Sequence, residues 1–137
     1  MMKLFQKEDS VPNINWSVWE RNNIVIWTYH EIQVKLEFLL PPLSISILKE
    51  TGLIGIALNY EESGSENLHI YDFSGQLVKI LKAPELGEKS QFGSIKEGIQ
   101  GRYEASIGYF RSGDWEDVVG DIDINTGKLI GATYRSY

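Results

Sequence analysis

The densest group of residues that could do chemistry lies near the C-terminus, where carboxylates surround a tryptophan. Asp114, Glu116 and Asp117 flank Trp115, and residues 112–127 contain five carboxylates and no lysine or arginine. Such crowding of like charge is unfavourable unless a cation or a basic partner relieves it. Tryptophan is enriched in binding hot spots, and nearby carboxylates favour a basic partner. The alternative is a core tryptophan at the start of a strand, beside carboxylates that neighbouring strands neutralise with Lys or Arg.

A possible metal site overlaps the end of this segment. Asp121, Asp123, Asn125 and Gly127 alternate like the first ligands of a calcium loop, which needs a sharp turn at its sixth position. Thr126 occupies that position, and isoleucines separate the carboxylates. This pattern is typical of a strand that runs into an Asn-Thr-Gly turn, so no metal ligands are predicted.

No set of residues predicts a reaction. His30 and His69 are isolated, without a second ligand at a metal-binding spacing, and are interpreted as surface or edge residues of strands. Adjacent carboxylates such as Glu116 and Asp117 point to opposite faces of a strand and therefore do not share a site. The sequence has no nucleophile elbow and no phosphate loop. We predict no catalytic residues, no cofactor and no enzymatic activity.

Composition limits the kind of protein further. The chain has 137 residues, of which 42% are hydrophobic and 23% charged, which is enough for one domain with one core. Its net charge of -6 argues against nucleic acid or an anionic membrane as partner. It has no cysteine, which excludes disulfides and thiolate metal sites. No apolar run resembles a signal peptide or a membrane span, so we expect a cytoplasmic protein.

The elements that must position these residues are expected to be strands. We predict an all-β, antiparallel meander of eight or nine strands with at most one short helix, either a sandwich or a partly open barrel. Residues 1–137 form one β-rich domain, in which residues 1–14 are a loosely ordered N-terminal segment. The meander is expected to include a hairpin of residues 16–21 and 24–29, a half-buried strand at 31–38, a hairpin of 68–73 and 76–82, and three strands at 102–110, 115–124 and 128–134.

Three other segments have less regular patterns. Residues 43–50 fit a strand or a short helix, and their alternation favours a strand. In residues 53–60, small side chains alternate with large ones, which predicts a strand pressed closely against a neighbour. Residues 83–100 have no strand character and are expected to form a connecting loop with at most one helical turn.

Two turns have similar sequences. Asp72 precedes Gly75, Asp123 precedes Gly127, and a polar residue and a leucine follow each glycine, as in turns that recur in β-propeller blades. The chain is too short for a normal propeller. We therefore interpret the two turns as ordinary hairpins.

A small, acidic, cysteine-free and β-rich chain with the carboxylate-rich segment 112–121 resembles the immunity proteins that bacteria make against polymorphic or contact-dependent toxins. The resemblance implies a non-enzymatic antitoxin that binds and neutralises a cognate, often basic, toxin domain. It also implies which residues contact the toxin, with carboxylates pairing with Lys or Arg and the tryptophan filling a pocket. These partner-binding residues are Asp114, Trp115, Glu116, Asp117, Asp121 and Asp123.

A second hypothesis is a small barrel that carries an apolar ligand, as lipocalin-like proteins do. An antiparallel chain of this length can enclose one ligand. Against this, Trp16 lacks the Gly-x-Trp context of lipocalins. The sequence leaves open the oligomeric state, the identity of a toxin and the existence of an interior cavity.

Overall fold

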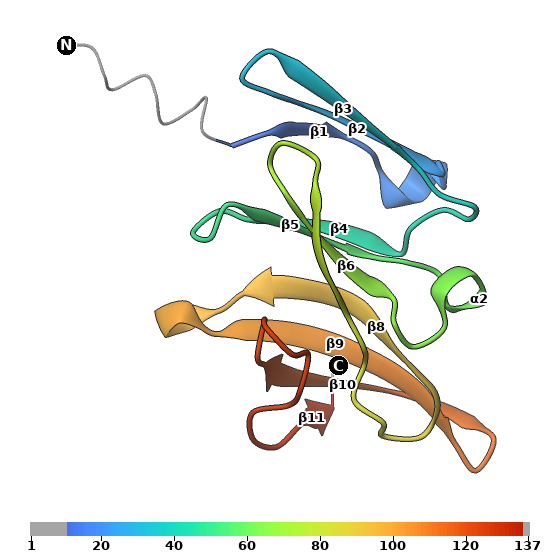
Figure 1. The fold of residues 1–137 in the computed structure, drawn as a ribbon. Coiled ribbons are helices and arrows are strands. Elements are labelled where there is room, and N and C mark those ends of the chain that lie inside the picture. Colours follow the sequence, from blue (N-terminus) through green and yellow to red (C-terminus); the bar gives the residue numbers. More distant parts are fainter. Residues whose placement is uncertain (1–10, 136–137) are drawn as a thin grey trace.

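The strands form three separate antiparallel sheets, each a meander of strands that are consecutive in sequence. The computed structural model describes residues 11–135. Sheet A has the order β1-β2-β3, sheet B the order β4-β5-β6-β7 and sheet C the order β11-β10-β9-β8. The sheets are stacked in layers, with sheet B in the middle (Figure 1). The all-β prediction is confirmed, with ten strands of three residues or more instead of eight or nine.

Strands account for most of the described chain. Sheet A consists of β1 (Asn13–Asn15), β2 (Ile24–Tyr29) and β3 (Ile32–Glu37). Sheet B consists of β4 (Ser44–Leu48), β5 (Leu53–Ala57), β6 (Leu68–Asp72) and β7 (Leu77–Leu81). Sheet C consists of β8 (Glu88–Glu97), β9 (Tyr103–Arg111), β10 (Asp114–Ile122) and the two-residue β11 (Tyr134–Arg135). The helical turns are η2 (Val18–Glu20), α2 (Tyr60–Ser63) and η3 (Ile99–Gly101). Within residues 11–135, no helix is both long and apolar enough to cross a membrane.

Strand β5 of the middle sheet is buried on both faces, which explains its alternation of small and large residues. Ile54 and Ile56 pack toward sheet A, whereas Ala57 packs toward sheet C. A Cβ atom at Gly55 would lie 2.6 Å from Cγ2 of Ile95 in β8, so this position has room only for glycine. The prediction of a strand pressed against a neighbour is confirmed.

Two clusters of buried side chains fill the spaces between the layers, where the sequence predicted one core. The cluster between sheets A and B contains Val25, Trp27, Val34, Ile54, Ile56, Leu58, Tyr71 and Phe73. The cluster between sheets B and C is larger and includes Leu48, Leu68, Ile70, Leu81, Phe92, Ile95, Tyr103, Ile107, Tyr109, Val118 and Ile122. The architecture is therefore a stack of three open sheets instead of a two-sheet sandwich or a barrel.

A buried amide fastens sheet B to sheet C. Asn67, which is fully buried just before β6, donates from Nδ2 to the carbonyl oxygens of Leu58 and Phe92, both at 2.8 Å. Its Oδ1 accepts from the Phe92 N–H at 2.8 Å. One side chain thus completes the hydrogen bonding of β8 at the point where the register between β8 and β9 shifts.

The predicted N-terminal hairpin is wrong. Residues 16–21 do not form a strand, and β2 pairs instead with β1 and β3. The tight turn lies at His30 and Glu31, whose φ angles of 50° and 65° are those of a two-residue hairpin turn. Asn22 and Asn23 hold the start of β2: the first accepts from the Ile24 N–H, and the second donates to the Phe38 carbonyl.

The predicted loop at residues 83–100 is also wrong, because ten of these residues form β8. Its buried positions are Ser90, Phe92 and Ile95, so the alternation changes phase at Gly93. A bulge of this kind inserts one residue and hides the period of two by which strands are recognised. No helical turn forms at residues 94–97.

The remaining segments largely follow expectation. Residues 44–48 are a strand, which decides the ambiguous stretch before Gly52, and the hairpin of β6 and β7 forms around Ser74 and Gly75. The last predicted strand is reduced to a single bridge between Ile122 and Leu129 and to the short β11. The expectation for residues 1–14 lies mostly outside the described residues, and Asn13 and Ile14 belong to β1.

The two similar turns occupy equivalent places in successive sheets. Each follows the third strand of its sheet, β6 in sheet B and β10 in sheet C. In each turn, the Oδ1 atom of an aspartate accepts a hydrogen bond from the N–H two residues later. Asp72 accepts from Ser74 at 3.0 Å, and Asp123 accepts from Asn125 at 2.8 Å. The similarity therefore reflects a repeated strand arrangement as well as ordinary turn chemistry.

Candidate binding surface around Trp115

Trp115 lies on the outer face of sheet C, away from the stack. In β10, Val118 and Ile122 belong to the buried cluster, so the alternate residues Trp115, Asp117 and Asp121 point outward. The tryptophan side chain remains 44% exposed. Trp115 is therefore not a core residue, which was the alternative that its place at the start of a strand had suggested.

The indole is held in place by its neighbours on the same face. Its ring meets that of Phe110 edge to face, with centroids 4.9 Å apart. Its Nε1 donates to Oδ2 of Asp117 at 3.1 Å. A Cβ atom at Gly108 would lie 2.1 Å from its Cζ2, so the ring lies directly on the β9 backbone. An aromatic that is fixed before binding loses little side-chain entropy when a partner covers it.

The other predicted carboxylates are distributed over both faces and a turn. Asp121 lies on the Trp115 face and forms an ion pair with Arg102 at 3.2 Å. Glu116 points toward sheet B and accepts from the Tyr109 hydroxyl at 3.0 Å. Asp114 begins β10 opposite Arg111, and Asp123 shapes the turn after β10. The structure thus places Trp115, Asp117 and Asp121 on one face of β10, with Asp117 in contact with the indole and Asp121 toward the other end of the strand, and places the other three predicted residues elsewhere.

The sequence analysis missed a polar network on the same outer face. Glu104 pairs with Lys96 at 3.2 Å and accepts from the Tyr134 hydroxyl at 2.8 Å. The hydrogen bond from Tyr134 and the contact with Lys96 lower the pKa of Glu104. The same hydrogen bond raises the pKa of Tyr134. Alternation in β9 could have placed Glu104 on this face. Its partners lie on β8 and β11, and β8 was expected to be a loop.

The alternating residues Asp121, Asp123, Asn125 and Gly127, which resemble a calcium loop, form the end of β10 and the turn after it. Asn125 Oδ1 accepts from Nζ of Lys79 at 3.0 Å, and the N–H groups of Thr126 and Gly127 donate to the Asp123 carbonyl. Asp121 is engaged by Arg102. These oxygens belong to a strand and the turn that follows it, as the sequence pattern indicated.

Residues 50–78, which contain five carboxylates and no lysine or arginine, also use carboxylates to complete backbone hydrogen bonding. Glu62 in α2 accepts from the N–H groups of Leu39 and Leu40 at 3.1 and 3.0 Å. Burial acts to raise the pKa of Asp72, but hydrogen bonds from Ser74, Gln76 and Gly75 outweigh it and lower that pKa. Part of the negative charge is therefore structural.

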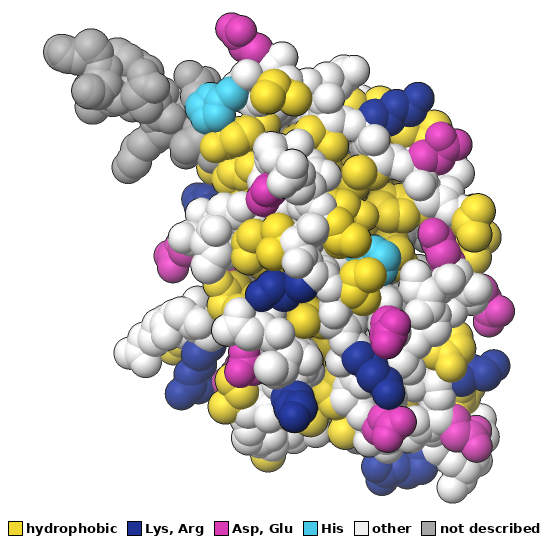
Figure 2. Space-filling model, in the orientation of Figure 1, with side chains coloured by type: hydrophobic (Ala, Val, Ile, Leu, Met, Phe, Trp, Pro, Cys, Tyr) yellow, Lys and Arg dark blue, Asp and Glu magenta, His cyan; other side chains and the backbone are white. Residues whose placement is uncertain are grey.

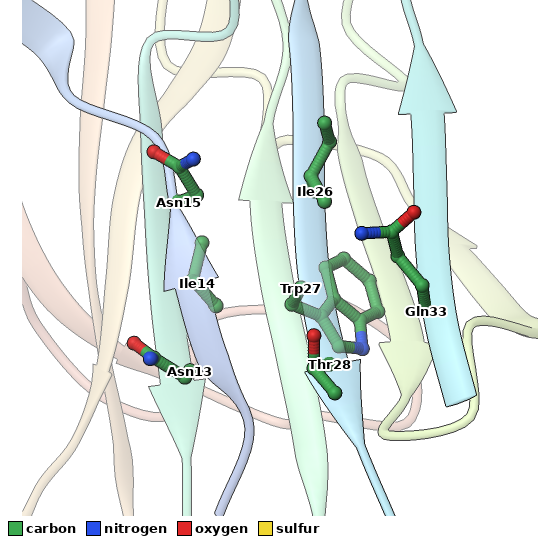
Figure 3. A pocket seen from close by; sticks show the side chains of 7 residues that line it. All are labelled: Asn13, Ile14, Asn15, Ile26, Trp27, Thr28 and Gln33. Atoms are coloured by element: carbon green, nitrogen blue, oxygen red, sulfur yellow. The ribbon is translucent and has the colours of Figure 1, made fainter. Parts of the chain in front are cut away.

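A shallow depression of 380 Å³ lies on the outer face of sheet A. Figure 3 shows the amides of Asn13, Asn15 and Gln33 beside it, with Ile26 and Thr28 from β2. Its lining combines these uncharged polar groups with apolar side chains and contains no titratable group for acid-base catalysis. Two clusters of packed side chains lie between the sheets.

Replacing Gly108 by alanine is expected to displace the Trp115 ring. The new methyl group would overlap Cζ2, so the indole must leave the β9 backbone and lose its bond to Asp117. We expect a loss of about 1–3 kcal/mol in the free energy of unfolding and faster acrylamide quenching of tryptophan fluorescence. Gly98→Ala is the control, because its Cβ atom would make only ordinary contacts, the nearest at 3.5 Å to the Arg102 carbonyl. Unchanged quenching in Gly108→Ala would contradict the placement of the ring.

Comparisons of the chain with protein-family models, with curated proteins and with solved structures find no match.

Proposed function

We propose that this chain is a non-enzymatic immunity protein of the cytoplasm that neutralises a basic toxin domain through the outer face of sheet C. The observation that carries the proposal is the half-exposed, prepositioned Trp115, with the Asp117 carboxylate bound to its indole. A rigid aromatic beside carboxylates suits a pocket rimmed by Lys or Arg.

The geometry refines the residues that would contact the partner. Trp115 would be the anchor, and Asp117 would pair with a cation at the rim of the pocket. Asp114 lies at the end of β10 closest to the anchor and is exposed, so it would contribute to attraction at longer range. Asp121 already forms an ion pair with Arg102, and it would either keep this pair while it contacts a cation of the partner or exchange Arg102 for that cation. Glu116 would not contact the partner. It would hold β10 in position through its hydrogen bond with Tyr109 on the inner face of sheet C.

The network beyond Asp121 extends this surface across sheet C. On the outer face, Glu104 in β9 and Tyr134 in β11 lie on opposite sides of β10, and the Tyr134 hydroxyl reaches Glu104 across that strand. Tyr134 is 58% exposed, and its hydroxyl is already oriented by Glu104. A second aromatic on the face would enlarge the contact area without the cost of ordering a free side chain.

The double substitution Asp114→Lys and Asp117→Lys is expected to abolish protection against the toxin. Reversing two charges places cations opposite those of the partner and removes the acceptor of the Trp115 indole. The measurement is survival of cells that express the basic toxin domain encoded beside this gene, together with binding of the purified pair. We expect binding to weaken at least a hundredfold, which corresponds to about 3 kcal/mol, because both reversed charges repel the cations of the partner and the anchor loses its support.

The matched control is the double substitution Glu20→Lys and Glu61→Lys, which changes net charge equally at exposed residues of η2 and α2, outside sheet C. It should leave protection intact. If both double variants protect equally well, the acidic-face mechanism is wrong. If the adjacent gene encodes no protein that binds the chain, the assignment as an immunity protein is wrong.

A further inference from the structure

Within residues 11–135, sheet A has one strand fewer than the other two sheets, and no described strand pairs with the outer edge of β3. Sheets B and C each have four strands, whereas sheet A ends at β3. Viewed onto sheet A, β3 is the last strand on its side, and β7 of the layer below lies beyond it (Figure 3). The turn between β6 and β7 contacts β3 where Gly75 meets Val34. A strand added at this edge, the vacant position, would therefore lie over β7.

The uncovered part of sheet B is apolar. Leu77 and Ile80 pair with Tyr71 and His69, which places them on the side of sheet B that faces sheet A. They are 48% and 45% exposed. Ile32 on β3 points inward as Val34 does, yet it is 55% exposed because no part of the described chain covers it from the side. Figure 2 shows hydrophobic side chains gathered over β6 and β7 on this face.

The free edge of β3 offers unpaired backbone groups at a regular spacing. Across the two-residue turn, Tyr29 in β2 and Ile32 in β3 form a hydrogen-bonded pair. Because such pairs alternate along an antiparallel ladder, the backbones of Val34 and Leu36 also bond to β2. The N–H and C=O groups of Gln33, Lys35 and Glu37 therefore point to the vacant position. Those three backbones bond to no other part of residues 11–135.

Free edges in proteins are commonly protected by inward-pointing charges or prolines. β3 has neither: its inward positions are Ile32, Val34 and Leu36, and its charges lie on the outer face. On the β7 side, Lys79 points away from the vacancy and bonds to Asn125. The edge is therefore open to an added strand.

We propose that the slot between β3 and β7 binds an extended segment of another polypeptide, which adds to sheet A as an antiparallel fourth strand. Side chains opposite Leu36 and Val34 would be apolar and would cover Leu77 and Ile80 on β7. The outward positions would lie opposite Glu37, Lys35 and Gln33 in that order, which selects a basic residue, then an acidic residue, then a polar one. This site lies on the opposite outer layer from Trp115 and does not depend on the proposed function.

The probe for this proposal is a capped synthetic peptide with the sequence TKVEVQT, with fluorescein attached through a flexible linker. Its lysine lies opposite Glu37, its glutamate opposite Lys35 and its valines over β7. The charge-swapped peptide TEVKVQT has the same composition. We expect the full chain to bind TKVEVQT about tenfold more tightly in fluorescence polarisation, because both cross-strand charge pairs are reversed in the second peptide. Hydrogen exchange at Gln33, Lys35 and Glu37 should slow when TKVEVQT binds.

The double substitution Lys35→Glu and Glu37→Lys is expected to invert the preference, so that TEVKVQT binds more tightly. Both residues are exposed, so the variant should fold like the parent. Ile80→Lys places a charge in the slot and should abolish binding of either peptide, while far-ultraviolet circular dichroism checks its fold. These two variants separate a strand site from general adhesion of peptides.

Several results would overturn the proposal. It is wrong if neither peptide binds, if both bind equally, or if the protected amides lie outside β3. If peptide binds only after residues 1–10 are removed, the slot belongs to that segment of the chain itself. If the full chain is a dimer that Ile80→Lys dissociates, the slot belongs to a second copy. Toxin protection is measured with variants of sheet C, so its outcome does not change the interpretation of peptide binding at β3.

Discussion

Replacing Asn67 by leucine lowers the free energy of unfolding by about 3–5 kcal/mol, since each buried backbone group left without a partner costs about 1–3 kcal/mol. The substitution removes all three hydrogen bonds of the side chain, two of which hold the N–H and the C=O of Phe92. The third holds the carbonyl of Leu58. A leucine of similar size fills the space but satisfies none of these groups. The measurement is urea unfolding followed by tryptophan fluorescence.

Asn125→Ala is the matched control for this experiment. Asn125 is exposed and makes one side-chain contact, with Lys79 at 3.0 Å. Its loss should change the free energy of unfolding by about 0.5 kcal/mol or less, as is usual for surface substitutions. If Asn67→Leu were as mild as the control, Asn67 would not fasten β8 to sheet B.

Replacing Trp27 by alanine is expected to cost about 3–5 kcal/mol, the usual range for removing a buried tryptophan. Trp27 is 1% exposed in the cluster between sheets A and B, and its Nε1 donates to the Phe73 carbonyl at 2.8 Å. Its ring also meets Tyr71 edge to face, with centroids 6.4 Å apart. Because sheet A is held to the stack by this cluster, urea unfolding of the variant should shift to a much lower denaturant concentration.

Trp19→Ala removes the same side chain from an exposed site and serves as the control. Trp19 is 90% exposed in η2, so its loss should change the free energy of unfolding by less than about 0.5 kcal/mol. Trp27→Phe adds a graded test: it keeps most of the apolar contact but leaves the Phe73 carbonyl unpaired, at a cost of about 1–3 kcal/mol. Equal stability of the two alanine variants would contradict the burial of Trp27.

The sequence predicted strands well where burial follows a strict alternation. In β5, the alternation of Gly55 and Ala57 with Ile54 and Ile56 indicated a strand with a close neighbour on one side. It did not reveal that large residues on the other face belong to a second core. Two-sided burial depends on how distant segments stack, and no local pattern in residues 53–60 shows which sheet covers each face.

The failures have local causes. β8 escaped notice because the shift at Gly93 breaks the alternation between Phe92 and Ile95. Residues 16–21 have the composition of a strand, but Trp19 is almost fully exposed and the segment forms a 3-10 turn. Composition alone does not distinguish an aromatic that packs from one that projects into solvent.

The candidate surface was only partly predictable. The alternation rule correctly separates Glu116 from Asp117, which point to opposite faces of β10. The same rule would have moved Glu116 out of the predicted contact set. The contact between the indole and Gly108 could not be predicted without the register between β9 and β10, because Gly108 lies opposite Asp117 on the neighbouring strand.

The meander order of the sheets has a consequence for how the chain folds. Every hydrogen-bonded strand pair joins strands that are neighbours in sequence, from β1-β2 to β10-β11. Closing short loops costs less entropy than closing long ones, and local pairings are associated with faster folding. Most all-β proteins are slow because distant strands must find each other. In this chain each sheet can assemble from one continuous stretch as it leaves the ribosome, and only the docking of finished layers joins distant residues.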